Sequence, residues 1–388
     1  MFIVISVIEF LLFICFSINI IYLLFFSVMS CKKCEKNADP ISVYKKIAIL
    51  IPAYREDKVI LECVNSCLQQ NYPKEAYDVV VISDRMKDET NNYLSSLPIE
   101  LVKVFFENST KSKALNLAME QIGDYDIALV LDADNTIEND FLCQINEIFA
   151  NPSVQIVQAH RTAKNTNTNM ALLDAVSEEI NNSIFRKGHV NAGFSAALIG
   201  SGMAFDYCLF KETMESVDAV GGFDRALELT LLYNEKRVHY LCDADVLDEK
   251  VQYRDAFSTQ RRRWLSAQVH YLMRFLNYFP QALFSGKWDF CDKLFQQMSI
   301  PRLILLGSTF IIAVLFSFLN WDIAIKWWIL FAILIFSLFL AIPRRMYSWR
   351  LFAALCELPY SFCLMFYNLF RLKGANKKFI HTSHGVEK

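Results

Sequence analysis

Residues 125–134 read YDIALVLDAD, an apolar run that ends on two aspartates, and this pattern indicates the fold. Two similar runs precede it, KIAILIPAY at 46–54 and YDVVVISD at 77–84. Segments 58–70 and 111–122 separate the three runs and space their apolar residues as helices do. Strands that are apolar on both faces and alternate with helices are typical of an open, mostly parallel sheet with helices on both faces. We therefore predict an α/β fold for the centre of the chain.

Polar residues follow the ends of the three predicted strands, at 54–57, at Asp84 and at 132–134. Ligands of open parallel sheets bind beyond the carboxyl ends of the strands, so these residues are expected to face one crevice. Strand alternation directs Asp132 and Asp134 to the same side. Two carboxylates placed in this way can hold a divalent cation, and we predict a metal site there.

The tripeptide Asp-Ala-Asp occurs a second time, at 243–245. This copy follows RVHYLC and precedes VLDEKV. We expect it to lie in a loop between a late strand and the next element, where acidic residues are usually solvated. We do not predict a metal site at the second copy.

Hydrophobic residues make up 54% of the 388 residues, too many for an ordinary soluble domain. The apolar excess lies at the two ends. Residues 2–29 contain a single charged residue, Glu9, and are long enough to cross a bilayer as a helix. Three further candidates for membrane spans lie at 303–319, 327–342 and roughly 350–370, the last interrupted by Glu-Leu-Pro at 357–359.

This distribution predicts five parts of the chain: an N-terminal transmembrane anchor (1–30), a central domain (46–264), amphipathic interfacial helices (265–299), a C-terminal transmembrane region (300–372) and a basic cytoplasmic tail (373–388).

Basic residues predict the orientation of these parts. Three lysines at 32–36 follow the first span and place the central domain in the cytoplasm of an integral membrane protein, at the inner or plasma membrane. The basic stretches 343–350 and 371–378 both favour the cytoplasmic side, which three complete C-terminal spans do not allow. A broken or re-entrant segment around Pro359 would resolve the conflict.

Cysteines do not indicate a metal site. Cys31 and Cys34 form a CxxC motif, but no second pair or histidine cluster completes a zinc site. We expect a reduced or acylated pair. Cys63 and Cys67 are four residues apart in a predicted helix, and we interpret them as packing residues.

Seven motifs occur in order along the chain. They are ILIPAYRED (49–57), VVVISD (79–84), SKALNLA (112–118), LVLDADN (129–135), GSGMAF (200–205), GGFDRALEL (221–229) and QRRRW (260–264). Together they resemble the membrane-bound family 2 glycosyltransferases, the group that contains cellulose and hyaluronan synthases. The resemblance covers roughly residues 46–275. It implies a GT-A-like domain and metal-dependent transfer of a sugar from a UDP-sugar.

The resemblance also implies a donor site. Asp84 would accept a hydrogen bond from the uracil N–H, and Asp134 would bind Mg²⁺ or Mn²⁺. The alternatives are that Asp84 caps a helix and that the residues of SKALN lie on a helix surface. The implied donor-binding residues are Ala53, Tyr54, Glu56, Asp84, Lys113, Asn116, Asp132 and Arg263. Within this set, Lys113 and Arg263 would contact the diphosphate.

On the acceptor side the resemblance implies Asp224 as general base. The family pattern there is Thr-Glu-Asp, and this chain has Phe223 in place of the glutamate. Glu228, one helical turn later, is the rival candidate. QRRRW also suits a basic helix on anionic lipid. The implied acceptor-binding residues are Gly200, Ser201, Gly202, Gln260 and Trp264.

Together these features predict an inverting glycosyltransferase that extends a polysaccharide at the inner membrane face. A homo-oligomer or accessory export subunits would complete a channel, because the predicted spans are few. We expect membrane lipid as a partner and no nucleic acid. Two alternatives stay open: transfer of a single sugar to a lipid-linked acceptor, and a non-catalytic membrane protein that binds nucleotide sugars.

Overall fold

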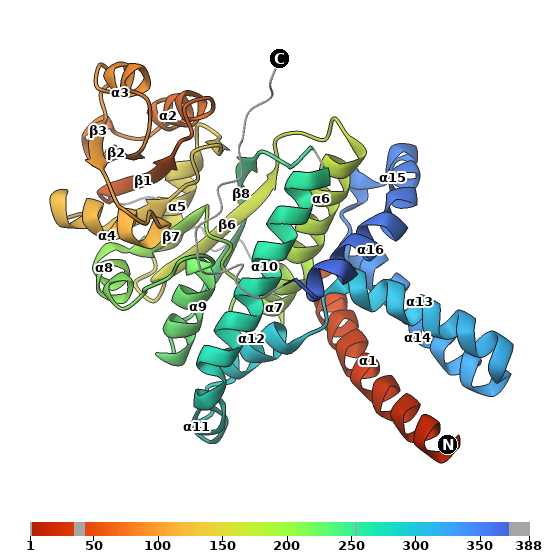
Figure 1. The fold of residues 1–388 in the computed structure, drawn as a ribbon. Helices are drawn as coiled ribbons and strands as arrows, with labels where there is room; N and C mark the ends of the chain where they lie inside the picture. Colours follow the sequence, from red (N-terminus) through yellow and green to blue (C-terminus); the bar gives the residue numbers. More distant parts are fainter. Residues whose placement is uncertain (1, 35–42, 253, 372–388) are drawn as a thin grey trace.

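The structure, a computed structural model, describes residues 2–34, 43–252 and 254–371 (Figure 1). Within these ranges, eight strands form one sheet in the order β3-β2-β1-β4-β7-β6-β8-β5. The strands are β1 (Ile47–Tyr54), β2 (Tyr77–Asp84), β3 (Glu100–Val104), β4 (Ile127–Val130), β5 (Thr136–Ile137), β6 (Ile156–Ala163), β7 (Met203–Asp206) and β8 (His239–Asp248).

Pairing in the sheet is mixed. β3, β2, β1 and β4 are parallel neighbours, and so are β6 and β8. β7 runs antiparallel to both β4 and β6, and β5 runs antiparallel to β8. The parallel half matches the prediction from the sequence. The antiparallel strand β7 was not foreseen, because the motif GSGMAF at its start was interpreted only as part of a binding pocket.

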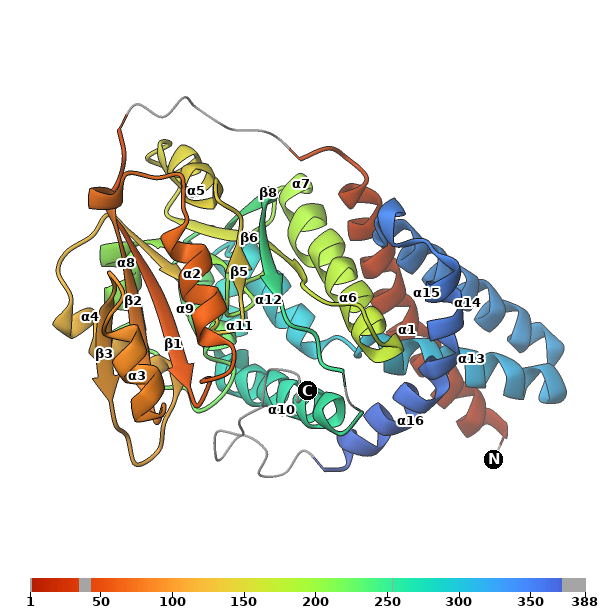
Figure 2. The same ribbon diagram turned by 90° about the horizontal axis from the view of Figure 1, so that it is seen from above.

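Helices surround the sheet and extend away from it (Figures 1 and 2). Those of the central domain are α2 (Ile60–Leu68), α3 (Asp88–Leu94), α4 (Lys111–Gln121), α5 (Phe141–Phe149), α6 (Asn169–Asn181), α7 (His189–Asn191), α8 (Tyr207–Glu215) and α9 (Phe223–Tyr233). The others are α1 (Phe2–Ser30), α10 (Arg254–Phe275), α11 (Phe279–Phe284), α12 (Trp288–Met298), α13 (Arg302–Leu319), α14 (Trp321–Ala341), α15 (Trp349–Ala354) and α16 (Leu358–Leu369).

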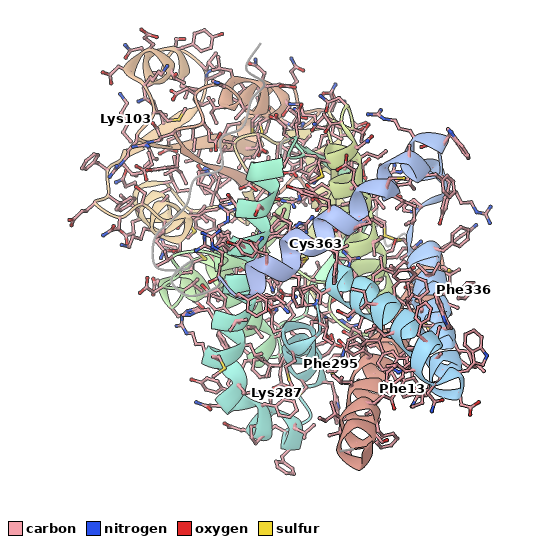
Figure 3. All side chains as sticks on the ribbon, turned by 45° about the vertical axis from the view of Figure 1, so that its right-hand side comes forward. Phe13, Lys103, Lys287, Phe295, Phe336 and Cys363 are labelled. Carbon is pink, nitrogen blue, oxygen red and sulfur yellow. A yellow bond between two sulfur atoms is a disulfide. The ribbon has the colours of Figure 1, made fainter. Side chains whose placement is uncertain are left out.

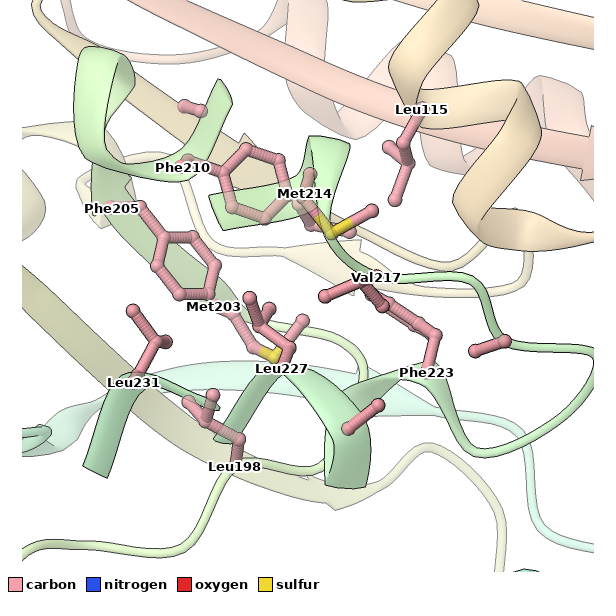
Figure 4. Close-up of a cluster of buried hydrophobic side chains, with 14 of the residues drawn as sticks. Leu115, Leu198, Met203, Phe205, Phe210, Met214, Val217, Phe223, Leu227 and Leu231 are labelled. Atoms are coloured by element: carbon pink, nitrogen blue, oxygen red, sulfur yellow. The ribbon is translucent and has the colours of Figure 1, made fainter. Parts of the chain in front are cut away.

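Strand β1 is buried on both faces. Its odd-numbered residues, such as Ile49, belong to a hydrophobic cluster that includes Cys63 and Cys67 of α2. Ala48 and Leu50 on its other face belong to a second cluster with side chains from α4, α8 and α9. Figure 4 shows part of this second cluster, in which Phe205 stacks on Phe210. The predicted helices on both faces are confirmed, and the two cysteines are packing residues.

Four helical segments are long and apolar enough to cross a membrane in the part of the chain that the structure describes. They are Ser6–Ser30, Arg302–Leu319, Trp321–Ala341 and Trp349–Leu369. The predicted interruption at 357–359 lies at a 3₁₀ turn, Leu355–Glu357, between α15 and α16. In Figure 3, Phe13 of α1 and Phe336 of α14 lie at the opposite end of the molecule from Lys103 of β3. The predicted tail, 373–388, lies outside the described residues.

The expected reduced pair of Cys31 and Cys34 is wrong. Cys34 forms a disulfide with Cys242 of β8, with the two Cα atoms 6.6 Å apart, and Cys31 is an exposed free thiol. The disulfide ties the segment after α1 to the strand that carries the second Asp-Ala-Asp. Its two cysteines are separated by 208 residues, so local spacing did not indicate the pairing.

An ion pair joins α1 to α14. The Glu9 carboxylate lies 2.8 Å from Lys326 Nζ and accepts a hydrogen bond of 2.7 Å from Trp327 Nε1. Glu9 and Trp327 are buried among apolar side chains. The single charged residue of the N-terminal run therefore specifies which helix packs against it, because a carboxylate in apolar surroundings needs these donors.

Replacing Glu9 by leucine is expected to lower the stability of the detergent-solubilised protein by about 1 kcal/mol, since Lys326 and the Trp327 indole lose their acceptor. Thermal unfolding would measure the loss. The variant Lys326→Leu and the double variant complete a cycle, in which the double variant should lose less than the sum of the two single changes. Strict additivity would contradict a coupled pair.

Candidate functional site

The first part of the site lies at the carboxyl ends of β1 and β2. The register pairs Tyr54 with Asp84, and Arg55 N donates to Asp84 O at 3.2 Å. Ala53 is buried, whereas Tyr54 and Glu56 are half-buried. The structure thus brings Asp84 together with three other residues that the resemblance assigns to the donor site.

The Asp84 side chain is buried, and among the described residues its Oδ1 has no hydrogen-bond partner. Burial raises the pKa of the Asp84 carboxyl. Helix α3 begins at Asp88 after Lys87, so the alternative that Asp84 caps a helix is wrong. A buried acceptor without a partner is energetically costly, so a hydrogen bond from a ligand N–H would strongly stabilise binding at this position.

Two arginines at these strand ends were not predicted. Arg55 and Arg85 have φ angles of 57° and 55°, a left-handed backbone conformation that is uncommon for residues other than glycine. Such conformations concentrate at functional sites. Arg85 Nη2 donates to Phe106 O at 2.9 Å, which ties the end of β2 to the segment after β3.

The second part of the site is an acidic group made of Asp132, Asp134 and Asp248. One oxygen from each carboxylate lies within 4.8 Å of the others. Asp132 and Asp134 follow β4, as predicted, and Asp248 ends β8. We did not predict Asp248, although an acid at a strand end is the signal that drew attention to Asp84. Three convergent carboxylates supply the oxygen donors that Mg²⁺ and Mn²⁺ prefer, so this group fits such an ion.

The second Asp-Ala-Asp lies inside β8, and its predicted placement in a loop is wrong. Asp243 is exposed and Asp245 is half-buried, and neither belongs to the acidic group. A bulge in the pairing of β6 with β8 falls between Ala159 and His160, which face this part of β8. Burial raises the pKa of Asp245.

Cations surround Asp248. Its carboxylate lies 2.6 Å from Lys250 Nζ and 3.7 Å from Arg161 Nη1, and both cations also bind the buried Glu178. Burial alone would raise the pKa of the Asp248 carboxyl, but Arg161 and Lys250 outweigh it and lower the pKa. Asp248 is thereby kept as an anion, the form that binds a metal ion.

A lysine that we did not predict, Lys111, reaches the acidic group. Lys113 is exposed, with its Nζ 3.5 Å from Asn108 O, and Asn116 donates to Met214 O of α8 at 3.0 Å. Lys111 Nζ instead lies 2.5 Å from Asp132 Oδ1 and 2.7 Å from Gly200 O. Both lysines belong to the first turn of α4, and the contact of Lys113 with a diphosphate stays a prediction.

Asp224 and Glu228 have different surroundings. Asp224 is half-buried in the first turn of α9, where an added Cβ on Gly200 would lie 3.7 Å from its side chain. Glu228 is buried and bound to Lys293 Nζ at 2.6 Å and to Leu198 N at 3.3 Å. Glu228 is thus engaged in a structural ion pair. Of the two acids, Asp224 is the one that lies beside Gly200.

The three arginines of QRRRW point in three directions. Arg261 binds Asp174 at 2.5 Å and lies 4.6 Å from the Trp264 ring. Arg262 Nε donates to Arg371 O at 2.9 Å. Burial lowers the pKa of Arg263, and the neighbouring charges of Asp132 and Asp224 oppose that shift.

Arg263 therefore lies near both the acidic group and the candidate base. Gln260 of the same motif has a buried Oε1 that finds no partner among the described residues.

The sequence profile described as "Glycosyltransferase like family 2" matches residues 45–267, more than half of the chain. The chain belongs to this family. The matched region contains every candidate residue described above. A single run of the chain, from before β1 to the middle of α10, therefore supplies the whole site.

Relatives of known name match parts of the chain. The beta-monoglucosyldiacylglycerol synthase of Synechocystis sp. is 26% identical over 248 residues, which cover 61% of this chain and 50% of that protein. TarS of Staphylococcus aureus, a poly(ribitol-phosphate) beta-N-acetylglucosaminyltransferase, is 28% identical over 101 residues, 25% of this chain and 18% of that protein. The chain thus spans about half the length, or less, of these relatives.

Among solved structures, the mannosyltransferase PcManGT of Pyrobaculum calidifontis, in complex with GDP-Man and Mn²⁺, has a TM-score of 0.51 at 17% identity. The match covers 83% of this chain and 97% of that one. The family 2 domain is GT-A-like, with transmembrane candidates at both ends.

The two lysines of α4 offer a matched test of the site. Lys111→Met should reduce turnover of a nucleotide-sugar donor by about 100-fold, because it removes the cation that lies between Asp132 and Gly200 O. Lys113→Met should leave turnover within a few-fold of the unchanged protein. Release of free nucleotide in detergent would measure both. Equal losses in the two variants would contradict the placement.

Proposed function

We propose that this protein transfers a sugar from a UDP-sugar to an acceptor hydroxyl, with inversion at the anomeric carbon, at the inner face of a membrane. The observation that carries the proposal is the bridge from Lys111 Nζ to Asp132 Oδ1 and to Gly200 O, with Asp224 beside Gly200, because it joins a donor side to an acceptor side. Membership of family 2 and the four apolar helices support it.

The donor base would bind at Asp84. Its buried Oδ1 suits an imide N–H, which uracil offers at N3. Cytosine presents a ring acceptor at the same position and would be repelled by the carboxylate. Guanine also has a ring N–H, so a competition experiment with UDP, GDP and CDP is informative. We expect UDP to bind most tightly.

A divalent ion, Mg²⁺ or Mn²⁺, would be held by Asp134 together with Asp132 and Asp248, and would stabilise the negative charge of the leaving diphosphate. Arg263 can bind the same diphosphate through its planar guanidinium. Lys111 lies between Asp132 and Gly200, where it can contribute a further positive charge. Together these cations favour departure of UDP.

Asp224 would accept the proton of the acceptor hydroxyl. As the proton moves to the carboxylate, the hydroxyl oxygen forms a bond to the anomeric carbon while the bond from that carbon to UDP breaks. A single displacement of this kind inverts the configuration. Gly200 lies beside Asp224 and Lys111. It would line the acceptor side together with Ser201, Gly202, Gln260 and Trp264.

The acceptor we propose first is a growing polysaccharide, with a second copy of the chain or accessory subunits completing an export path. A lipid-linked acceptor is the second candidate, favoured by the match to synthases of beta-monoglucosyldiacylglycerol. Product sizing separates the two candidates, because a polymerase yields a ladder and a lipid glycosyltransferase adds one sugar.

The variant Asp224→Asn should reduce UDP release by about 100-fold or more while UDP still binds, since only the proton acceptor is lost. A panel of UDP-sugars with Mg²⁺ or Mn²⁺ in detergent would identify the active donor first. Asp218→Asn, which changes an exposed acid six residues earlier, is the control and should retain activity. UDP binding without release in the unchanged protein would instead support a non-catalytic sensor.

Removal of the metal should abolish UDP release, and Mn²⁺ should restore it. Asp134→Asn is expected to weaken Mn²⁺ binding strongly, because it removes a charged oxygen ligand. Electron paramagnetic resonance of free Mn²⁺ would measure the affinity without any turnover. Asp243→Asn, in the second Asp-Ala-Asp, should bind Mn²⁺ like the unchanged protein. Full binding by the Asp134 variant would refute the assignment.

A further inference from the structure

Asn135 follows the first Asp-Ala-Asp and is completely buried. Its Nδ2 donates to Asp134 Oδ1 at 3.2 Å and to Asp248 Oδ1 at 3.1 Å. Its Oδ1 accepts from Asp132 N at 3.2 Å and from Ser201 Oγ. One amide thus touches all three members of the acidic group, and both of its polar atoms are fully used.

The amide suits this place because it is neutral. Carboxylates that converge repel one another, and a donor shared by two of them holds their oxygens at a fixed separation. A lysine in the same position would do so with a positive charge that competes with a bound cation. Asn135 supplies the direction of two hydrogen bonds without that charge. Partners of this kind orient ligands in metal sites.

The same amide connects the acidic group to the loop that contains Gly200, Ser201 and Gly202, which we call the acceptor-side loop. Ser201 is completely buried, and its Oγ also accepts from Asp132 N at 2.9 Å. Gln158 holds the other side of this loop: its Nε2 donates to Ser201 O at 3.0 Å and its Oε1 accepts from Ile199 N at 3.0 Å. The loop is thus fixed between two buried amides, Gln158 and Asn135.

The loop also has little freedom to move. Gly200 and Gly202 have φ angles of 88° and 62°, which favour glycine, and an added Cβ on Gly202 would lie 2.9 Å from Val246 of β8. Asp248 is two residues further along the same strand. The loop, β8 and the segment after β4 therefore meet at Asn135.

We propose that Asn135 is a positioning residue that holds the three carboxylates in a metal-binding arrangement and couples that arrangement to the acceptor-side loop through Ser201. The inference rests on the proposed metal site at Asp132, Asp134 and Asp248. It adds a residue that neither binds the metal nor touches substrate. Its consequence is that metal affinity depends on Asn135 and, to a smaller extent, on Ser201.

The test compares Asn135→Ala with Asn146→Ala. Asn146 of α5 is a matched control: it is also buried, its Nδ2 donates to Val43 O at 3.0 Å and its Oδ1 accepts from Lys45 N at 3.0 Å. Both variants should lose stability in thermal unfolding, because each leaves buried partners unsatisfied. Only Asn135→Ala should weaken Mn²⁺ binding, by about 10- to 100-fold.

Mn²⁺ titration of the full chain by paramagnetic resonance gives the affinities without turnover. Ser201→Ala should weaken Mn²⁺ binding a few-fold. If Asn135→Ala does not fold, the Mn²⁺ affinity of Ser201→Ala tests the proposal in its place. Unchanged affinity in Asn135→Ala, or in Ser201→Ala when the first variant is unfolded, would overturn the proposal. A wild-type protein without saturable Mn²⁺ binding would instead refute the metal site, so the two failures are distinguishable.

Discussion

Three carboxylates with oxygens within 4.8 Å of one another impose the main constraint on this structure. Two like charges at 4 Å repel by about 4 kcal/mol at an effective dielectric constant of 20, more than one ordinary hydrogen bond contributes. Cations must therefore compensate the charge. Lys111 does so at Asp132, and Lys250 and Arg161 do so at Asp248. Hydrogen bonds from Asn135 then determine where the oxygens point.

These compensating groups come from distant parts of the chain, and this explains the arrangement of the domain. Lys111 begins α4, Arg161 lies on β6, and Lys250 follows β8. The parallel half of the sheet brings the ends of β1 and β2 beside β4, while the antiparallel β7 brings the Gly-Ser-Gly loop to the same edge. The residues proposed for the donor side and for the acceptor side meet because the sheet changes direction at β7.

Helix α10 joins the site to the apolar helices. Its arginines reach α6, the end of α16 and the acidic group, so three structural units meet on one turn of helix. Asn368 of α16 also donates to Ser258 O of α10 at 3.3 Å. Each arginine of QRRRW thus has different surroundings.

Local signals in the sequence determined much of this protein. Apolar strands that end on acids identified the edge of the sheet and the positions of Asp84, Asp132 and Asp134. The apolar ends of the chain identified the four candidate spans, because hydrophobic length is a property of a contiguous segment. Asp224 was chosen over Glu228 by motif alignment, and the burial of Glu228 with Lys293 agrees with that choice.

Only the tertiary structure decided which distant groups meet. Asp248 joins the acidic group, Lys111 rather than Lys113 reaches Asp132, and Cys34 pairs with Cys242, although none of these contacts has a local pattern. A helix turn presents neighbouring lysines in different directions, and the partner across space selects between them. The sequence by itself therefore specified the elements and their polar ends, whereas packing of the sheet specified the pairs, because a contact between distant residues depends on the path of the whole chain.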